Sequence, residues 1–139
     1  MSVRPLPAVV LMLAWLPMAA GPALADGTVA PGPQRLEFGY PSPEAALADL
    51  RQRQGVVVFE RNGWTVADDK PNRTWWSFTP AGHPAHPSGV KRVIVQAPNG
   101  DVSIAMSAKC GAPDEACEAL LVEFHLMNDQ LRQRLNAGR

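Results

Sequence analysis

Two histidines in a proline-rich stretch are the side chains of this chain best suited to chemistry. His83 and His86 lie within residues 80–89, and a proline directly follows each of them. Neutral imidazole binds Zn²⁺ or Cu²⁺, but a zinc site needs at least three protein ligands. The third histidine, His125, is expected far along the chain, beside the apolar stripe of a helix. We therefore assign no metal site, although metal handling through His83 and His86 stays open as an alternative to hydrogen bonding within the loop.

Aromatic and basic side chains flank this loop in adjacent pairs. Successive side chains of a strand point to opposite faces, so one of Trp75 and Trp76 must enter the core while the other lies on the open face or under the loop. Lys91 and Arg92 divide in the same way, and a cation beside the loop can bind a carboxylate or phosphate. Aromatic residues are enriched at recognition surfaces, although local packing and ordinary strand-edge charge also explain these pairs. The predicted binding residues are Trp75, Trp76, His83, His86, Lys91 and Arg92.

No catalytic arrangement is evident in the sequence. The chain contains no G-x-S-x-G, H-E-x-x-H or P-loop motif. Its only two cysteines, Cys110 and Cys117, are expected to be bonded to each other, so neither is a free nucleophile. We predict a non-catalytic protein with no cofactor.

The beginning of the chain is typical of an exported protein. Residues 1–25 combine Arg4, an apolar run and the small-residue pattern Ala23-Leu24-Ala25, which predicts a secretory signal peptide cleaved before Asp26. No membrane span is expected after cleavage, and the location is expected to be the periplasm. In an oxidising compartment an isolated cysteine pair predicts a disulfide, here Cys110–Cys117.

The elements that must position these residues follow from hydrophobic periodicity and turn residues. Residues 26–41, rich in Gly and Pro, are expected to be a flexible leader, and residues 42–139 a single α+β domain. Asn-Gly pairs at positions 62–63 and 99–100 predict tight hairpins. Strands are expected at residues 56–60, 64–68, 74–79, 90–97 and 102–107, and helices at residues 43–54 and 113–136. The predicted fold is a five-stranded antiparallel meander whose single apolar face both helices cover, a two-layer sandwich.

The net charge of the chain bears on whether it binds nucleic acid. Thirteen basic residues (Lys and Arg) balance thirteen acidic ones, so the chain lacks the excess of positive charge that nucleic-acid binding needs. We expect no nucleic-acid partner. Another periplasmic protein is the expected partner.

Several short motifs resemble a group of small, uncharacterised exported proteins of Gram-negative bacteria. They are Tyr40-Pro41-Ser42-Pro43, Gly63-Trp64, the stretch W-S-F-T-P-x-G-H-P at positions 76–84, V-K-R at 90–92 and the cysteine pair. The resemblance implies a periplasmic location and no particular activity. The sequence thus favours a periplasmic binding module, such as an inhibitor or immunity-like protein, that uses the loop and the open face of the sheet.

Overall fold

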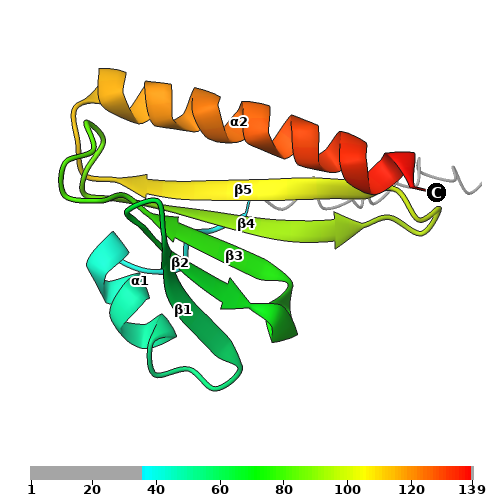
Figure 1. The fold of residues 1–139 in the computed structure, drawn as a ribbon, viewed down its shortest axis with the longest axis horizontal. Helices are drawn as coiled ribbons and strands as arrows, with labels where there is room; N and C mark the ends of the chain where they lie inside the picture. Colours follow the sequence, from blue (N-terminus) through cyan, green and yellow to red (C-terminus); the bar gives the residue numbers. More distant parts are fainter. Residues whose placement is uncertain (1–35, 139) are drawn as a thin grey trace, which may run out of the picture. The chain divides into compact units, whose positions relative to one another are not determined.

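A five-stranded antiparallel sheet forms the centre of the fold in the computed structural model, which describes residues 36–138. Its strands lie side by side in chain order, as a meander (Figure 1). The strands are β1 (Val56–Arg61), β2 (Trp64–Asp69), β3 (Thr74–Phe78), β4 (Ser88–Gln96) and β5 (Val102–Cys110). A short 3₁₀ turn, η1 (Lys70–Asn72), joins β2 to β3, and the helices are α1 (Pro43–Leu50) and α2 (Asp114–Ala137). The α+β class, the antiparallel meander and the long C-terminal helix are confirmed.

Local residue choices explain most element boundaries. Ser42 caps α1 by accepting a hydrogen bond from the Ala45 N–H at 3.1 Å. Asn62 and Gly63 both have positive φ, which a two-residue hairpin between β1 and β2 requires. The helix expected at residues 43–54 ends earlier, at Leu50, and turns lead from there to β1.

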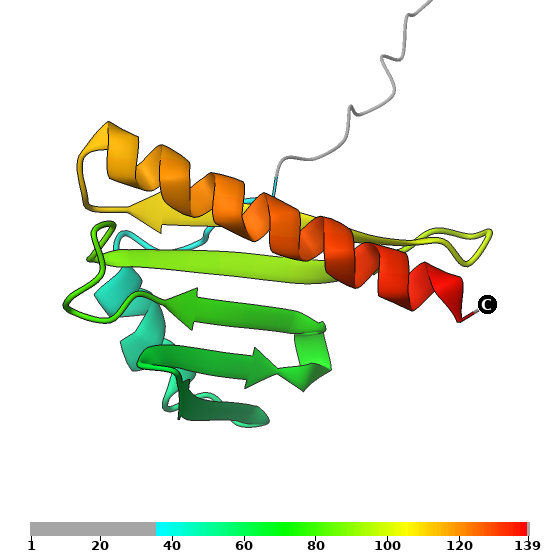
Figure 2. The same cartoon turned by 45° about the horizontal axis from the view of Figure 1, so that its top comes forward.

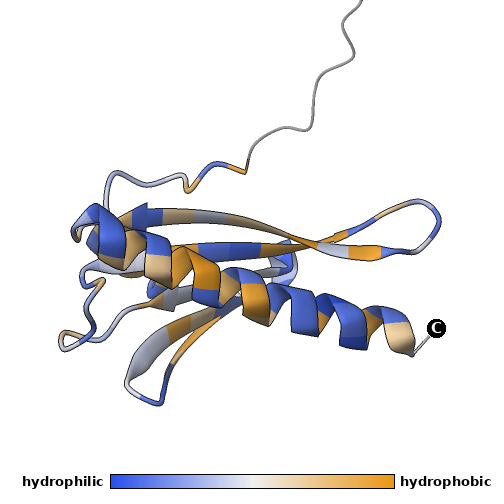
Figure 3. Cartoon of the chain, turned by 90° about the horizontal axis from the view of Figure 1, so that it is seen from above, coloured by the Kyte–Doolittle hydropathy of each residue, from blue (hydrophilic) through white to orange (hydrophobic). Residues whose placement is uncertain are grey.

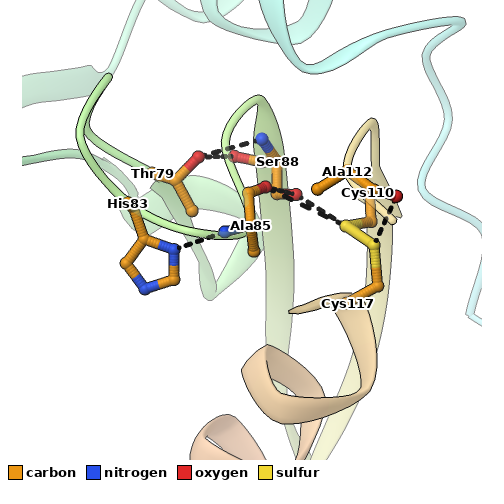
Figure 4. The surroundings of a disulfide bond; sticks show 7 residues. All are labelled: Thr79, His83, Ala85, Ser88, Cys110, Ala112 and Cys117. Atoms are coloured by element: carbon orange, nitrogen blue, oxygen red, sulfur yellow. Dashed lines mark hydrogen bonds between the residues drawn. A yellow bond between two sulfur atoms is a disulfide. The ribbon is translucent and has the colours of Figure 1, made fainter. Parts of the chain in front are cut away.

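The loop-side ends of β4 and β5 extend further than their sequences suggest. Ser88 pairs with Cys110, so β4 begins two residues earlier and β5 ends three residues later than expected. The disulfide between Cys110 and Cys117 is formed, with a Cα–Cα distance of 6.0 Å, and joins the end of β5 to the first turn of α2. Figure 4 shows this disulfide beside Ala85 of the loop and Ser88, the first residue of β4. The Ser88 Oγ atom lies 2.9 Å from Cys110 Sγ.

The two helices lie on opposite faces of the sheet, which corrects the expectation that both cover one face (Figures 1 and 2). On one face, Ala46 and Leu50 of α1 pack with core residues of β2 and β3. On the other, Leu120 and Phe124 of α2 pack with Val90 and with Met106 of β5. The reason is that β1 and β3 carry large apolar side chains on both faces, so each face needs its own cover. The apolar residues of α2 gather in its first half and middle, and the following turns are mostly hydrophilic (Figure 3).

The end of the expected leader belongs to the folded domain. Phe38 is buried in the core under α1, and Tyr40 packs against the same cluster. Their rings contact Trp76 edge-on, with centroids 5.3 Å and 5.6 Å away. These contacts are long-range, so the Pro- and Gly-rich composition of residues 26–41 gave no indication of them. The expected signal peptide, residues 1–25, and leader residues 26–35 lie outside the described residues.

No helix within residues 36–138 is a candidate for a membrane span. Within this range α2 is the longest helix, and neither helix is apolar enough over a sufficient length to cross a bilayer.

Candidate functional site

The six predicted binding residues divide between the two faces of the sheet and the loop. Trp75 is paired with Arg92, and Trp76 with Lys91, on neighbouring strands. Directly opposed residues of antiparallel strands share a face. Trp75 and Arg92 therefore lie on the face of α2, whereas Trp76 and Lys91 lie on the face of α1. The structure does not bring the six together into one surface.

The face of α2 contains an open groove. The helix runs along β5 and leaves the same face of β1, β2 and β3 uncovered (Figure 2). The resulting groove has a volume of about 510 Å³. Four aromatic residues line it, together with apolar, polar and charged ones: Phe59, Trp64, Trp75 and Phe124, with Arg61, Asn62, Val66, Asp68, Ser77, Arg92, Glu123, Met127 and Leu131. A concave surface that combines aromatic and apolar walls with polar side chains is typical of ligand-binding sites.

One cross-strand row forms the polar part of the groove floor. Asp68, Trp75 and Arg92 follow one another on β2, β3 and β4. The Trp75 indole N–H donates a hydrogen bond to Asp68 at 3.1 Å, and the Arg92 guanidinium lies 5.9 Å from the centre of the Trp75 ring. Trp75 thus stands between the acid and the base, and strands two apart are roughly 10 Å from each other. Asp68 and Arg92 form no ion pair.

Arg92 is a partly buried cation of the groove whose set of partners is incomplete. Its guanidinium lies between two rings, 5.1 Å from the centre of Phe124 on the side of α2. Within residues 36–138 it forms no ion pair, its Nε is buried without a hydrogen-bond partner, and its only hydrogen bond is a long one of 3.5 Å to Asn128. Burial away from water lowers the pKa of Arg92. Partial burial of a cation without a counter-ion costs free energy.

A hydroxyl group adds to the polar part of this floor. Ser77 lines the groove two residues after Trp75 on the same face, opposite Val90. In the part of the chain that the structure describes, no hydrogen bond to its hydroxyl is found. The groove floor therefore places the Arg92 cation and the Ser77 hydroxyl among aromatic rings.

The cations of the opposite face have partners. Lys91 donates to the backbone carbonyl of Glu37 at 3.0 Å and lies 5.2 Å from the centre of the Trp76 ring. Burial, with a smaller contribution from the charge of Arg53, lowers the pKa of Lys91. Arg53 binds Asp49 at 2.5 Å and the buried Asp69 at 3.2 Å. Lys91 therefore fixes the N-terminal segment to the sheet and does not reach the groove.

A second arrangement of acids and bases completes this structural face. The Tyr40 hydroxyl donates to Asp49 at 2.5 Å and accepts from Arg53. Hydrogen bonds from Tyr40, and then from Arg53, lower the pKa of Asp49. Asp69 also accepts from the Asn72 amide at 2.9 Å. The charges here neutralise one another.

The two loop histidines use their Nδ1 atoms to hold the loop. His83 Nδ1 accepts a hydrogen bond from the Ala85 N–H at 3.0 Å (Figure 4). His86 Nδ1 lies 3.0 Å from the carbonyl of Thr79, to which it donates. Residues 36–138 contain no group of three or more His, Cys, Asp or Glu side chains placed to hold a metal ion. The metal-handling alternative gains no support from this geometry.

His83 nevertheless links the loop to the groove. Its ring contacts Trp64 at 5.1 Å between centroids, and Trp64 in turn contacts Phe124 at 5.8 Å. The loop therefore packs against one aromatic wall of the groove. The outer tryptophan of β3, Trp75, was expected beside the loop, but it lies half-buried in the groove, and the ring that contacts His83 of the loop is that of Trp64.

Several groove residues were missed at the sequence level, namely Phe59, Trp64, Asp68 and Phe124. A usable indication was present in β1, whose residues 56–59 are all apolar and so must place apolar side chains on both faces of the sheet. Phe59 is 36% exposed and Val57 55% exposed on the groove face. The position of Phe124 over Arg92 depends on how α2 crosses the sheet, which no local pattern encodes.

Comparisons with known proteins identify no relative. The resemblance to exported proteins of Gram-negative bacteria therefore stays a prediction. No protein-family model, no curated protein and no solved structure matches this chain.

Proposed function

We propose that this protein is an exported, non-catalytic binding module whose binding surface is the aromatic groove. The observation that carries the proposal is the groove itself, which combines four aromatic residues with a partly buried arginine that has no acidic partner in residues 36–138. The partner expected from the sequence, another periplasmic protein, stays a prediction. Trp75 and Arg92 are retained from the predicted binding residues.

The exposed apolar surface supports a binding role over a purely structural one. This face already has a buried core under α2, in which Leu120 and Phe124 pack on Val90. Phe59 and Met127 extend the apolar surface beyond that core and are each 36% exposed. Contiguous exposed apolar surface is costly in a monomer and marks interaction sites.

Export is supported by the cysteine pair. Both cysteines are consumed in one disulfide, a bond that persists in oxidising compartments. We expect protein recovered from the periplasm of an expressing bacterium to begin at Asp26 and to gain two hydrogens on reduction, as measured by intact mass spectrometry. Retention of residues 1–25, or two free thiols in the isolated protein, would contradict export with disulfide formation.

The groove can be tested with a neutral apolar dye. Nile red carries no charge, so its fluorescence reports the apolar surface alone. We expect saturable binding to the wild type and a severalfold weaker affinity for Phe59→Ala, whose ring lines the groove at the edge strand.

Leu126→Ala is the matched control, because Leu126 is 60% exposed on α2 and does not line the groove. If Leu126→Ala weakens dye binding as much as Phe59→Ala does, the dye binds elsewhere and the groove is not the binding surface.

A further inference from the structure

We infer that the ligand of the groove is a small apolar molecule that ends in a carboxylate, and that Arg92 binds the carboxylate. This inference rests on the proposed function and adds the chemical class of the ligand. It commits to a small molecule because the volume, about 510 Å³, lies within the range of small-molecule sites.

The need for an anion follows from the charge balance of the groove floor. Arg92 is partly buried between Trp75 and Phe124, and its hydrogen bond to Asn128 supplies no negative charge. Arg53, on the other face, has two carboxylate partners at 2.5 and 3.2 Å. A ligand anion would give Arg92 the partner that the described part of the chain does not provide.

The remaining charges of the groove favour a single negative charge. Asp68 lies beyond Trp75 and accepts its indole N–H, and Glu123 lines the groove from α2. Both would repel a dianion such as a phosphate monoester. Arg61, the other cation of the lining, lies over the Phe59 ring at 5.6 Å, at the end of the edge strand. A carboxylate carries one charge and two oxygens, which match the planar donors of a guanidinium and leave the Ser77 hydroxyl as a further donor.

The apolar part of the ligand has a defined surface to lie on. Phe59 and Met127 are partly exposed, and Leu131 continues the lining one turn further along α2. These residues lie on β1 and on α2, whereas Arg92 lies on β4 between them in the groove floor. A ligand with its carboxylate on Arg92 would therefore lay its apolar body between the edge strand and the helix.

A pair of ligands that differ only in the head group tests the inference on the wild-type protein. Decanoate is ionised at pH 7, and 1-decanol has the same chain without charge. Titration calorimetry should give a dissociation constant on the order of tenfold lower for decanoate, since hydrogen bonds to a charged group contribute more than neutral ones. Equal affinities, or tighter binding of decanol, would overturn the inference.

Neighbouring residues on opposite faces provide matched variants. Arg92→Met should abolish the preference for decanoate, while Lys91→Met should keep it, because Lys91 lies on the face of α1. Arg61→Met should also keep it. If the preference is lost in Arg61→Met and kept in Arg92→Met, the carboxylate binds at the rim and Arg92 is not its partner.

The outcomes separate the inference from the proposed function. Circular dichroism establishes whether Arg92→Met folds. If this variant does not fold, the inference is still tested by the affinities of the wild type for decanoate and decanol and by the preference of Arg61→Met. Binding of Nile red without any preference for decanoate overturns the carboxylate while the groove remains the binding surface. Absence of Nile red, decanoate and decanol binding to the wild type overturns both.

Discussion

The two faces of the sheet differ in how their positive charges are neutralised. Under α1, Arg53 is bonded to Asp49 and Asp69, and Lys91 is bonded to the Glu37 carbonyl. Under α2, Arg92 has aromatic neighbours and one weak amide contact. The first face is closed by α1 and the N-terminal segment, whereas the second is half covered. The comparison teaches that satisfied charges mark the structural face and an unsatisfied charge marks the candidate site.

Adjacent residues of a strand lie on opposite faces of this sheet. Three pairs of adjacent residues place one member in the groove and the other on the face of α1. Named in that order, they are Trp75 and Trp76, Asp68 and Asp69, and Arg92 and Lys91. Each pair holds residue type and sequence position nearly constant while the environment changes. Substitutions within a pair therefore measure the difference between the faces directly.

The tryptophan pair should show the largest effect on stability. Trp76 is 2% exposed and packs with Phe38 and Phe78, so Trp76→Ala should cost about 3–5 kcal/mol of unfolding free energy. Trp75 is only partly buried in the groove, so Trp75→Ala should cost about 1–2 kcal/mol and weaken Nile red binding. Denaturant melts of both variants test this, and equal losses would mean that the groove floor is as much a core as the face of α1.

The aspartate pair should differ less. Asp69 is 2% exposed and accepts hydrogen bonds from Arg53 and Asn72, so Asp69→Ala should destabilise by about 3 kcal/mol. Asp68 accepts one hydrogen bond from Trp75, so Asp68→Ala should cost about 1 kcal/mol. Thermal and denaturant unfolding provide the measurement. A larger loss for Asp68→Ala would remove the distinction between a structural and a functional face.

The loop histidines should show the smallest effect. The sequence predicts that the double substitution His83→Ala and His86→Ala leaves stability nearly unchanged. Because each ring takes part in a hydrogen bond that holds the loop, we expect the double substitution to lower the free energy of unfolding by about 1–2 kcal/mol. Nile red binding should weaken slightly, since His83 supports the Trp64 wall. A loss well above about 2 kcal/mol in denaturant melts would make the loop part of the core of this domain.

The sequence by itself determined the elements and their order. Alternation in β5, the Asn62-Gly63 turn, the Ser42 cap and the apolar spacing of Leu120 and Phe124 are local patterns, and the structure has the corresponding strands, hairpin and helices. The Cys110–Cys117 bond also followed, because the chain has only two cysteines. Strand alternation further implied that each adjacent pair of the site is divided between the faces.

Tertiary structure alone decided which face each helix covers and which cation lacks a partner. Helix placement depends on packing between residues far apart in the chain, such as Phe38 with Trp76 or Phe124 with Arg92. Hydrophobic periodicity predicts that a side chain is buried, but it does not predict which residues the side chain packs against. The sequence could not choose between Lys91 and Arg92 for the same reason: their difference lies in the Glu37 carbonyl and the Phe124 ring, which only the folded chain brings to them.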